Sequence, residues 1–165
     1  DEDELSSTEL RLIGANWRDI SFLFKTREAI LEKVKSSLNV MGHIPRQVVL
    51  ENLGQSDFSV LLRPSELRYS KAGFPTKVVE SLALGIPVIT NITSDLGEHI
   101  FDMKNGIIVD SCSPNALCEA LRKALRLTDD QRLSMKKCAR QSAENSFDSE
   151  NYIEVMKSIL CDDYD

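Results

Sequence analysis

The chain has 165 residues, the length of one ordinary domain and enough to bury a hydrophobic core. Hydrophobic residues make up 42% and charged residues 28%, which argues against a disordered tail. The apolar runs are far shorter than the roughly 20 residues of a membrane-spanning helix. The formal charge is −6, but seven acidic residues lie at the two ends and leave the body close to neutral. We therefore expect a soluble domain that has no transmembrane segment. The absence of a basic surface also indicates that it binds no nucleic acid.

Four cysteines lie in the last third of the chain, without a Cys-x-x-Cys pair, and both histidines are far from them in the sequence. This spacing argues against a zinc site. A disulfide framework is typical of shorter, secreted chains. We therefore expect reduced thiols, a cytoplasmic location, and no metal or other cofactor.

Strand and helix patterns alternate along the chain. In chain order, we expect a strand over residues 9–13, a helix over 22–37, a strand over 38–41, a short helix after Pro45 ending near Gly54, a strand over 58–62, a polar loop over 63–74, a helix over 76–84, a strand over 87–90, a short helix over 95–101, a strand over 107–109, and helices over 114–125, from 129, and over 149–160. This alternation predicts an α/β, Rossmann-like fold, in which helices cover both faces of a parallel sheet and further helices close the chain. Residues 1–165 are expected to form a single domain.

Three of these helices have recognisable start signals. Ser113 followed by proline is typical of a capped helix start. Asp95 with Glu98, and Thr128 with Gln131, have the spacing of a capping box.

The loop after the third strand concentrates residues that suit an anion. Ligands of open α/β sheets collect at the carboxyl ends of the strands, so this loop is well placed. Gly73 allows a ligand to approach the backbone, and Pro75 makes the entry into the next helix rigid. The free amides at that helix start attract anions, and Arg63, Arg68 and Lys71 add positive charge.

Lys77 and Glu80, three residues apart, are expected on one face of the same helix. Amides and basic side chains suit phosphate oxygens, and a carboxylate suits sugar hydroxyls. Together they predict a site for a nucleoside diphosphate with its ribose. The alternative interpretation is a solvated ion pair beside an ordinary helix entry. Neither a Gly-x-Gly-x-x-Gly nor a Walker motif is present, which argues against a dehydrogenase and a P-loop hydrolase.

Residues 72–90, Ala-Gly-Phe-Pro-Thr-Lys-Val-Val-Glu-Ser-Leu-Ala-Leu-Gly-Ile-Pro-Val-Ile-Thr, resemble the donor-site segment of retaining, nucleotide-sugar glycosyltransferases of the GT-B fold. The resemblance is greatest to bacterial enzymes that build capsular and other surface polysaccharides. Residues 42–57 and 105–110 also resemble this family, so the similarity covers most of the chain from residue 9 to 125. It implies the carboxyl-terminal, donor-binding half of a GT-B enzyme that transfers a hexose from a nucleoside diphosphate to a growing polysaccharide or lipid-linked acceptor.

The resemblance also implies parts that this chain lacks. The amino-terminal acceptor domain and the first strand–helix unit of the donor domain have no counterpart in these residues. The chain alone is therefore expected to be inactive, and the full-length enzyme to work at the inner face of the membrane.

The resemblance assigns roles to individual residues. Glu80 matches the glutamate that holds the ribose hydroxyls, and Gly42, His43 and Ile44 match the turn that flanks the base. The residues expected at the donor phosphates and sugar are Gly73, Phe74, Pro75, Thr76, Lys77, Arg63 and Lys71. Ala72 stands where the family has its first glutamate. No residue is assigned as catalytic, because no general base is recognised.

Two alternative functions remain open at this stage. One is a GT-B-fold epimerase of nucleotide sugars, whose catalytic carboxylates would come from the absent half. The other is a non-catalytic α/β module of the receiver or nucleotide-sensing kind, although Asp57 precedes its strand where a receiver needs an aspartate at a strand end. His99 is interpreted as a surface or capping residue, and Phe147 as a packing residue.

Overall fold

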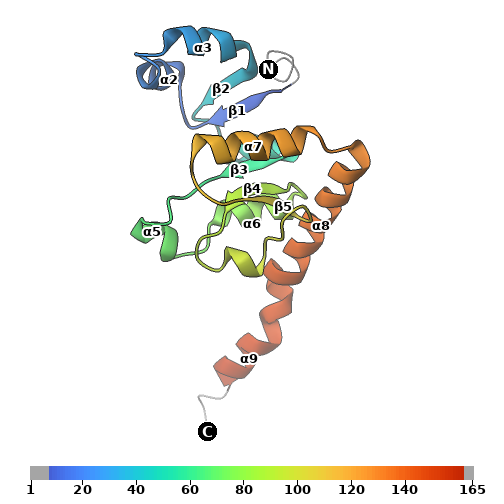
Figure 1. Cartoon of the computed structure of the whole chain (residues 1–165). Helices are drawn as coiled ribbons and strands as arrows, with labels where there is room; N and C mark the ends of the chain where they lie inside the picture. Colours follow the sequence, from blue (N-terminus) through green and yellow to red (C-terminus); the bar gives the residue numbers. More distant parts are fainter. Residues whose placement is uncertain (1–7, 162–165) are drawn as a thin grey trace. The chain divides into compact units, whose positions relative to one another are not determined.

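The computed structural model describes residues 8–161 of the chain. The chain divides into two compact units, Asp1–Asn52 and Leu53–Asp165 (Figure 1). That both belong to one domain remains a prediction from the sequence.

The first unit contains a two-stranded parallel sheet. Its elements are β1 (Leu10–Ile13), α2 (Trp17–Leu23), α3 (Glu28–Val34), the 3-10 helix η1 (Lys35–Ser37), β2 (Leu38–Gly42) and most of α4 (Arg46–Gly54). At the start of the sheet, the carboxylate of Glu9 accepts hydrogen bonds from Arg11 and Asn39. These bonds, that from Arg11 most of all, lower the pKa of Glu9.

The prediction of one helix over residues 22–37 is wrong, because two shorter helices replace it. Helix α2 begins earlier than predicted, since Asn16 and Asp19 form a capping box at its start. After α2 the backbone turns, and the N–H of Arg27 bonds to the carbonyl of Phe24. The apolar spacing that predicted one helix joined Phe24, which follows α2, with Ile30, Leu31 and Val34 of α3 and with Leu38 of β2.

The second unit is built on a three-stranded parallel sheet in the order β3–β4–β5. The strands are β3 (Ser59–Leu61), β4 (Val88–Asn91) and β5 (Gly106–Val109). All residues of the central strand β4 are buried, as expected for a parallel strand covered on both faces. The predicted parallel α/β arrangement is confirmed.

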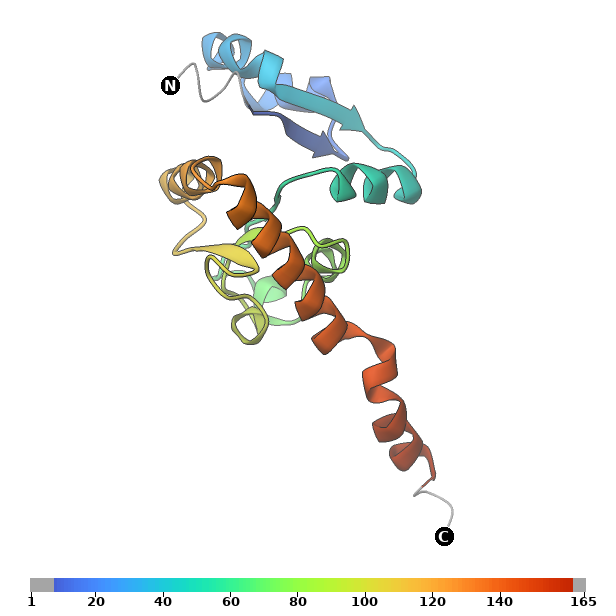
Figure 2. The same ribbon diagram turned by 90° about the vertical axis from the view of Figure 1, so that its right-hand side faces the viewer.

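Helices cover both faces of this sheet (Figures 1 and 2). The helical elements of this unit are α5 (Arg68–Lys71), α6 (Thr76–Ala83), the 3-10 helix η2 (Leu96–Glu98), α7 (Pro114–Leu125), α8 (Asp129–Phe147), the 3-10 helix η3 (Ser149–Tyr152) and α9 (Ile153–Cys161). Val88 packs in a core cluster with Val78 and Leu82 of α6, whereas Ile89 packs in a second cluster that includes Ala120 of α7. Adjacent residues of β4 thus face opposite layers of helices.

Two of the three predicted helix starts are confirmed. The side chain of Ser113 accepts the N–H of Ala116, and Thr128 forms a capping box with Gln131. The box predicted from Asp95 is wrong. The backbone at Asp95 has φ −89° and ψ 11° instead of the extended conformation of a capping residue, and its side chain does not cap η2.

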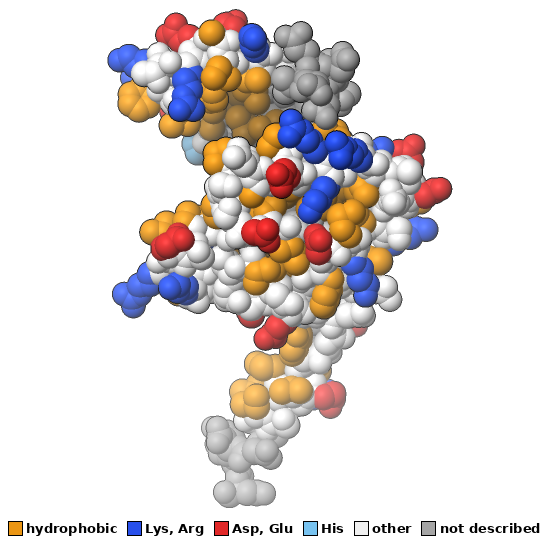
Figure 3. Space-filling model, in the orientation of Figure 1, with side chains coloured by type: hydrophobic (Ala, Val, Ile, Leu, Met, Phe, Trp, Pro, Cys, Tyr) orange, Lys and Arg blue, Asp and Glu red, His pale blue; other side chains and the backbone are white. Residues whose placement is uncertain are grey.

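Helix α9 exposes apolar side chains (Figure 3). They are Ile153, Val155, Met156, Ile159 and Leu160. Even so, no helix within residues 8–161 has the length and apolar content needed to cross a bilayer.

The start of β5 admits only glycine. A Cβ built on Gly106 would lie 2.6 Å from the carbonyl oxygen of Val88 and 2.9 Å from Cγ2 of Ile100. The Val88 carbonyl belongs to the central strand and cannot move without disturbing the sheet. Gly106 therefore fixes how closely β5 approaches β4.

We predict that Gly106→Ala lowers the free energy of unfolding by about 1–3 kcal/mol, because the added methyl group overpacks the sheet. Urea denaturation monitored by circular dichroism measures the change. Gly54→Ala is the matched control: a Cβ there meets no atom within 4 Å, so a change within about 0.5 kcal/mol is expected. Equal denaturation midpoints for the two variants would contradict the steric argument.

Candidate functional site

The loops after the three strands of the second unit are joined at the carboxyl edge of the sheet. The Oδ1 of Asn91, the last residue of β4, accepts the N–H of Arg63 at 2.9 Å, and its Nδ2 donates to the Arg63 carbonyl at 2.8 Å. In the loop after β5, the Sγ of Cys112 lies 3.5 Å from the same Oδ1. The edge predicted to receive the ligand is therefore an ordered polar framework.

The guanidinium group of Arg63 contacts the loop that follows β3. Nη1 donates to the carbonyl of Gly73 at 3.0 Å, and Nη2 donates to the carbonyl of Tyr69. The guanidinium carbon lies 5.4 Å from the centre of the Tyr69 ring, within cation–π distance. Arg63 is predicted to contact the donor phosphates, but two of its N–H groups bond to the protein backbone.

Helix α6 begins with exposed residues at the end of this loop. Pro75 is the capping residue and, among the described residues, no side chain caps the helix. Thr76 and Lys77 occupy the first two helical positions and are exposed, whereas the N–H of Val78 bonds to the Pro75 carbonyl. The partial positive charge of a helix start attracts anions, so this position suits a phosphate group.

Lys77 and Glu80 lie on one face of α6, as the sequence predicts. The Nζ of Lys77 is 2.9 Å from the Oε2 of Glu80. The Lys77 side chain is 67% exposed but that of Glu80 only 21%, so the carboxylate is not part of a fully solvated surface pair. Val78 and Leu82 are buried on the other side and anchor the helix to the sheet.

The side chain of Phe74 packs in an aromatic cluster. Its ring centre is 5.2 Å from that of His99 and 5.2 Å from that of Phe147, which ends α8. The interpretation of His99 as a capping residue is confirmed, because it ends η2 and its N–H bonds to the carbonyl of Leu96. Its ring is half-buried, however, and lies 4.8 Å from the Phe147 ring. Phe147 packs as predicted. Because the Phe74 ring makes these contacts, the predicted contact of Phe74 with a ligand would be made by its backbone.

Lys71, in the last turn of α5, is exposed. In the same loop the pKa of Glu66 is lowered, first by its own backbone N–H, then by the Ser65 hydroxyl, and less by the charge of Lys71. These local contacts stabilise the charged form of Glu66 itself.

Gly42, His43 and Ile44 belong to the first unit, and the other predicted site residues belong to the second. Gly42 ends β2 with φ +66°, in the left-handed region that favours glycine. Its N–H bonds to the Ala15 carbonyl at 2.9 Å, and its own carbonyl accepts the N–H of Gly14 at 2.7 Å. His43 is exposed and Ile44 is half-buried.

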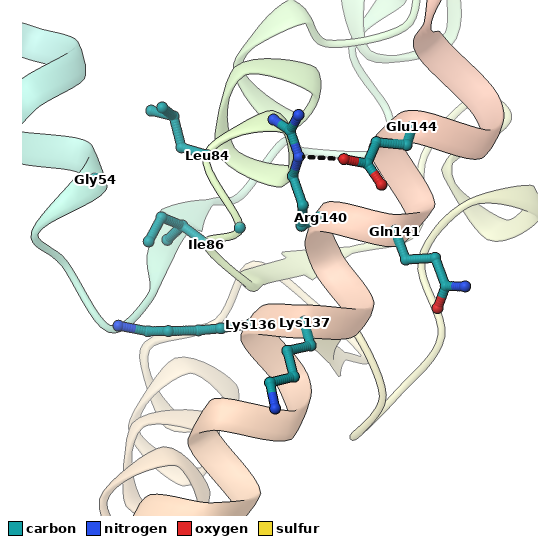
Figure 4. Close-up of a pocket in the computed structure, with 9 residues that line it drawn as sticks. Gly54, Leu84, Ile86, Lys136, Lys137, Arg140, Gln141 and Glu144 are labelled. Carbon is teal, nitrogen blue, oxygen red and sulfur yellow. Dashed lines mark hydrogen bonds and ion pairs between the residues drawn. The ribbon is translucent and has the colours of Figure 1, made fainter.

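A shallow groove of about 520 Å³ lies elsewhere in the second unit (Figure 4). Its lining residues are Gly54, Leu84, Gly85, Ile86, Lys136, Lys137, Arg140, Gln141 and Glu144. Gly85 and Ile86 come before β4, whereas the predicted ligand loops follow the strands. None of the predicted site residues lines this groove.

Two of the three basic residues that line the groove, Lys136 and Arg140, have structural partners. Lys136 donates to the Ser56 carbonyl at 3.0 Å and pairs with Asp57 at 3.2 Å. Arg140 bonds to the carbonyl of Ala83 at the end of α6, and it pairs with a glutamate one turn further along α8 (Figure 4). These contacts tie α8 to the turn between α4 and β3 and to the end of α6, where a cation complements exposed helix carbonyls.

The described residues contain no group of three or more His, Cys, Asp or Glu side chains that could hold a metal ion. Cys112, Cys118 and Cys138 are free thiols. The side chain of Cys161 lies outside the described part of the chain.

A comparison with protein families identifies the chain. The family described as "Glycosyl transferases group 1" matches residues 3–142. The chain therefore belongs to this family, and the resemblance found in its sequence is confirmed.

One related protein is the putative colanic acid biosynthesis glycosyltransferase WcaL of Escherichia coli K12. It is 24% identical over 128 residues, which cover 78% of this chain and 32% of WcaL. The chain thus spans about a third of the length of this relative.

Similar solved structures include HepE of Anabaena in complex with UDP, with a TM-score of 0.71 and 16% identity over 98% of this chain and 44% of HepE. Sucrose-phosphate synthase of Thermosynechococcus elongatus has a TM-score of 0.69 and 18% identity over 93% of this chain and 38% of that enzyme. The predicted fold class, a Rossmann-like half of a GT-B structure, is confirmed. The family and these relatives favour a glycosyltransferase over the epimerase and the non-catalytic module.

We predict that Lys136→Ala lowers the free energy of unfolding by about 1 kcal/mol, because the carbonyl of Ser56 and the carboxylate of Asp57 lose their partner. Lys137→Ala removes the exposed neighbouring charge in the same groove and should change stability by no more than about 0.5 kcal/mol. Thermal and urea denaturation of the two variants measure the difference. A larger loss for Lys137→Ala would contradict the structural role of Lys136.

Proposed function

We propose that this chain is the donor-binding half of a glycosyltransferase that moves a sugar from a nucleoside diphosphate to a growing surface polysaccharide or a lipid-linked acceptor. The observation that carries the proposal is the uncapped start of α6, with the partly buried Glu80 one turn further along the helix. Membership of the glycosyltransferase family supports transfer of a sugar. The name of WcaL, which refers to colanic acid biosynthesis, supports a polysaccharide product, and the UDP bound to HepE supports a nucleotide-sugar donor.

In this proposal the donor diphosphate binds the amides of Thr76 and Lys77, and the ribose hydroxyls bind the carboxylate of Glu80. Glu80 already accepts a hydrogen bond from Lys77. Lys77, which lies beside the proposed phosphate position, therefore also orients the carboxylate. The backbone of residues 73–75 approaches the sugar, and residues 42–44 flank the base. Lys71 and Arg63 contribute positive charge to the same loop.

The chemistry follows from where charge develops. When the bond between the anomeric carbon and the diphosphate breaks, its electron pair stays on the departing phosphate oxygen. Amides and cations already aimed at that oxygen stabilise the transition state more than the ground state. The acceptor hydroxyl oxygen then bonds to the anomeric carbon, and its proton passes to the departing phosphate oxygen. We assign no general base in this chain.

The finer features of the reaction follow the family resemblance. We propose a hexosyl donor, retention of configuration at the anomeric carbon, and no cofactor besides the donor. The acceptor binds a separate amino-terminal domain, and the complete bacterial enzyme makes capsular or other surface polysaccharide at the cytoplasmic face of the membrane.

We predict that UDP, GDP or ADP raises the melting temperature of the chain, because a ligand at 100 times its dissociation constant adds about 2.7 kcal/mol of stability. Glu80→Gln keeps the size of the side chain but replaces the charged carboxylate, which accepts hydrogen bonds from the ribose hydroxyls, with a neutral amide. It should therefore weaken binding of the nucleotide by about tenfold or more. Differential scanning fluorimetry and isothermal titration calorimetry measure both effects.

The control is Glu119→Gln, which removes an exposed carboxylate from α7 and should leave binding unchanged. Equal affinity of Glu80→Gln and the wild-type chain would contradict the ribose-binding role. If none of the three nucleotides binds the wild-type chain, donor binding by these residues is wrong.

A further inference from the structure

We propose that Arg63 is a positioning residue: together with Asn91 it forms a clasp that holds the loop of residues 64–75 in the shape that presents the start of α6 to the donor. This inference rests on the proposed function. It replaces a direct contact between Arg63 and the donor phosphates with an action through the loop.

The base of the clasp is the side chain of Asn91. Strands β3 and β4 pair in parallel up to Leu61, which lies opposite Thr90. Past that point, the side-chain amide of Asn91 replaces the backbone pairing of the two strands. It bonds to both the N–H and the carbonyl of Arg63. Asn91 is only 6% exposed, and hydrogen bonds shielded from water hold their groups firmly. The backbone of Arg63 is therefore fixed to the central strand.

The arm of the clasp is the Arg63 guanidinium. It reaches the carbonyl of Tyr69, six residues further along the chain, and that of Gly73, ten residues further along. A planar guanidinium presents several N–H groups in a rigid fork, so a single side chain holds two points of the loop at once. The ring of Tyr69 adds a cation–π contact, with its centre 5.4 Å from the guanidinium carbon.

These contacts fix the part of the loop that leads into α6. Gly73 is held through its carbonyl, and the next residue, Phe74, is held by its ring against His99 and Phe147. Thr76 and Lys77 follow after Pro75, so the direction of their amides depends on this anchored segment. A Cβ built on Gly73 would meet no atom within 4 Å, which leaves the backbone open on that side. A loop that is already ordered avoids the entropy cost of ordering it on binding.

The same contacts distinguish positioning from direct binding. The N–H groups of Arg63 that bond to Gly73 and Tyr69 point at backbone carbonyls and not at a ligand. Lysine keeps the positive charge but has a single ammonium group without the planar fork. Arg63→Lys therefore separates the two roles: it breaks the clasp but preserves the charge.

The experiment combines hydrogen exchange with nucleotide binding. In the wild-type chain, Arg63→Lys, Arg63→Ala, Asn91→Ala and the double variant of Arg63→Lys with Asn91→Ala, amide exchange of residues 67–77 is measured without ligand. The dissociation constants of UDP, GDP and ADP are then measured at low and high salt. Arg126→Lys, an exposed arginine after α7, is the matched control. Circular dichroism verifies folding, and if Asn91→Ala does not fold, Arg63→Lys alone decides.

We expect Arg63→Lys and Asn91→Ala each to speed exchange of the loop amides and to raise the dissociation constant of the bound nucleotide by about tenfold, because each breaks two hydrogen bonds. The salt dependence of binding should stay unchanged. The double variant should lose little more than either single variant, since the two residues act as one unit. Arg126→Lys should match the wild-type chain.

The proposal would be overturned if the loop amides of Arg63→Lys exchanged at the wild-type rate. It would also be overturned if they exchanged faster while the affinity for the nucleotide stayed unchanged. A weaker salt dependence in Arg63→Ala with normal loop exchange would overturn it too, because that result indicates a direct ionic contact. If the wild-type chain binds none of the three nucleotides, the proposed function fails. The exchange rates alone then decide whether Arg63 and Asn91 hold the loop.

Discussion

Complete burial of the central strand β4 is the constraint on which the second unit depends. Val88 and Ile89 point to opposite faces, so helices must cover both sides of the sheet. Gly106 lets β5 approach the carbonyl of Val88 more closely than any side chain would allow. Because β4 is held on all sides, its last residue, Asn91, is a fixed point at the carboxyl edge. The loops that carry the candidate site are built from that point.

Helix α6 connects this core to the proposed chemistry. Val78 and Leu82 are buried against the sheet, and the face with Lys77 and Glu80 stays accessible. The packing of two apolar residues therefore determines where the helix start and the carboxylate lie. A substitution that loosens this packing would displace the proposed donor site even if the substituted residue makes no contact with the ligand. A loss of binding is therefore interpreted together with the measured stability of the variant.

Basic residues near one another serve different purposes in this protein. Lys136 ties α8 to the turn before β3, Arg140 ties it to the end of α6, and Arg63 ties a loop to its own strand end. Lys77 instead lies exposed at a helix start, beside a carboxylate. The positive charge of a region does not by itself identify an anion site. The partners of each cation decide whether it supports the fold or remains accessible to a ligand.

The sequence by itself determined the alternation of strands and helices, the position of α6, and the caps at Ser113 and Thr128, since each depends on residues close together in the chain. It also contained the family resemblance around Glu80. It did not reveal the turn that divides residues 22–37, because apolar spacing alone does not distinguish one helix from two. Only the tertiary structure decided the ring contacts of His99 and the pairing of Asn91 with Arg63, 28 residues away. Contacts between distant residues depend on how the strands align, and local patterns carry no information on that alignment.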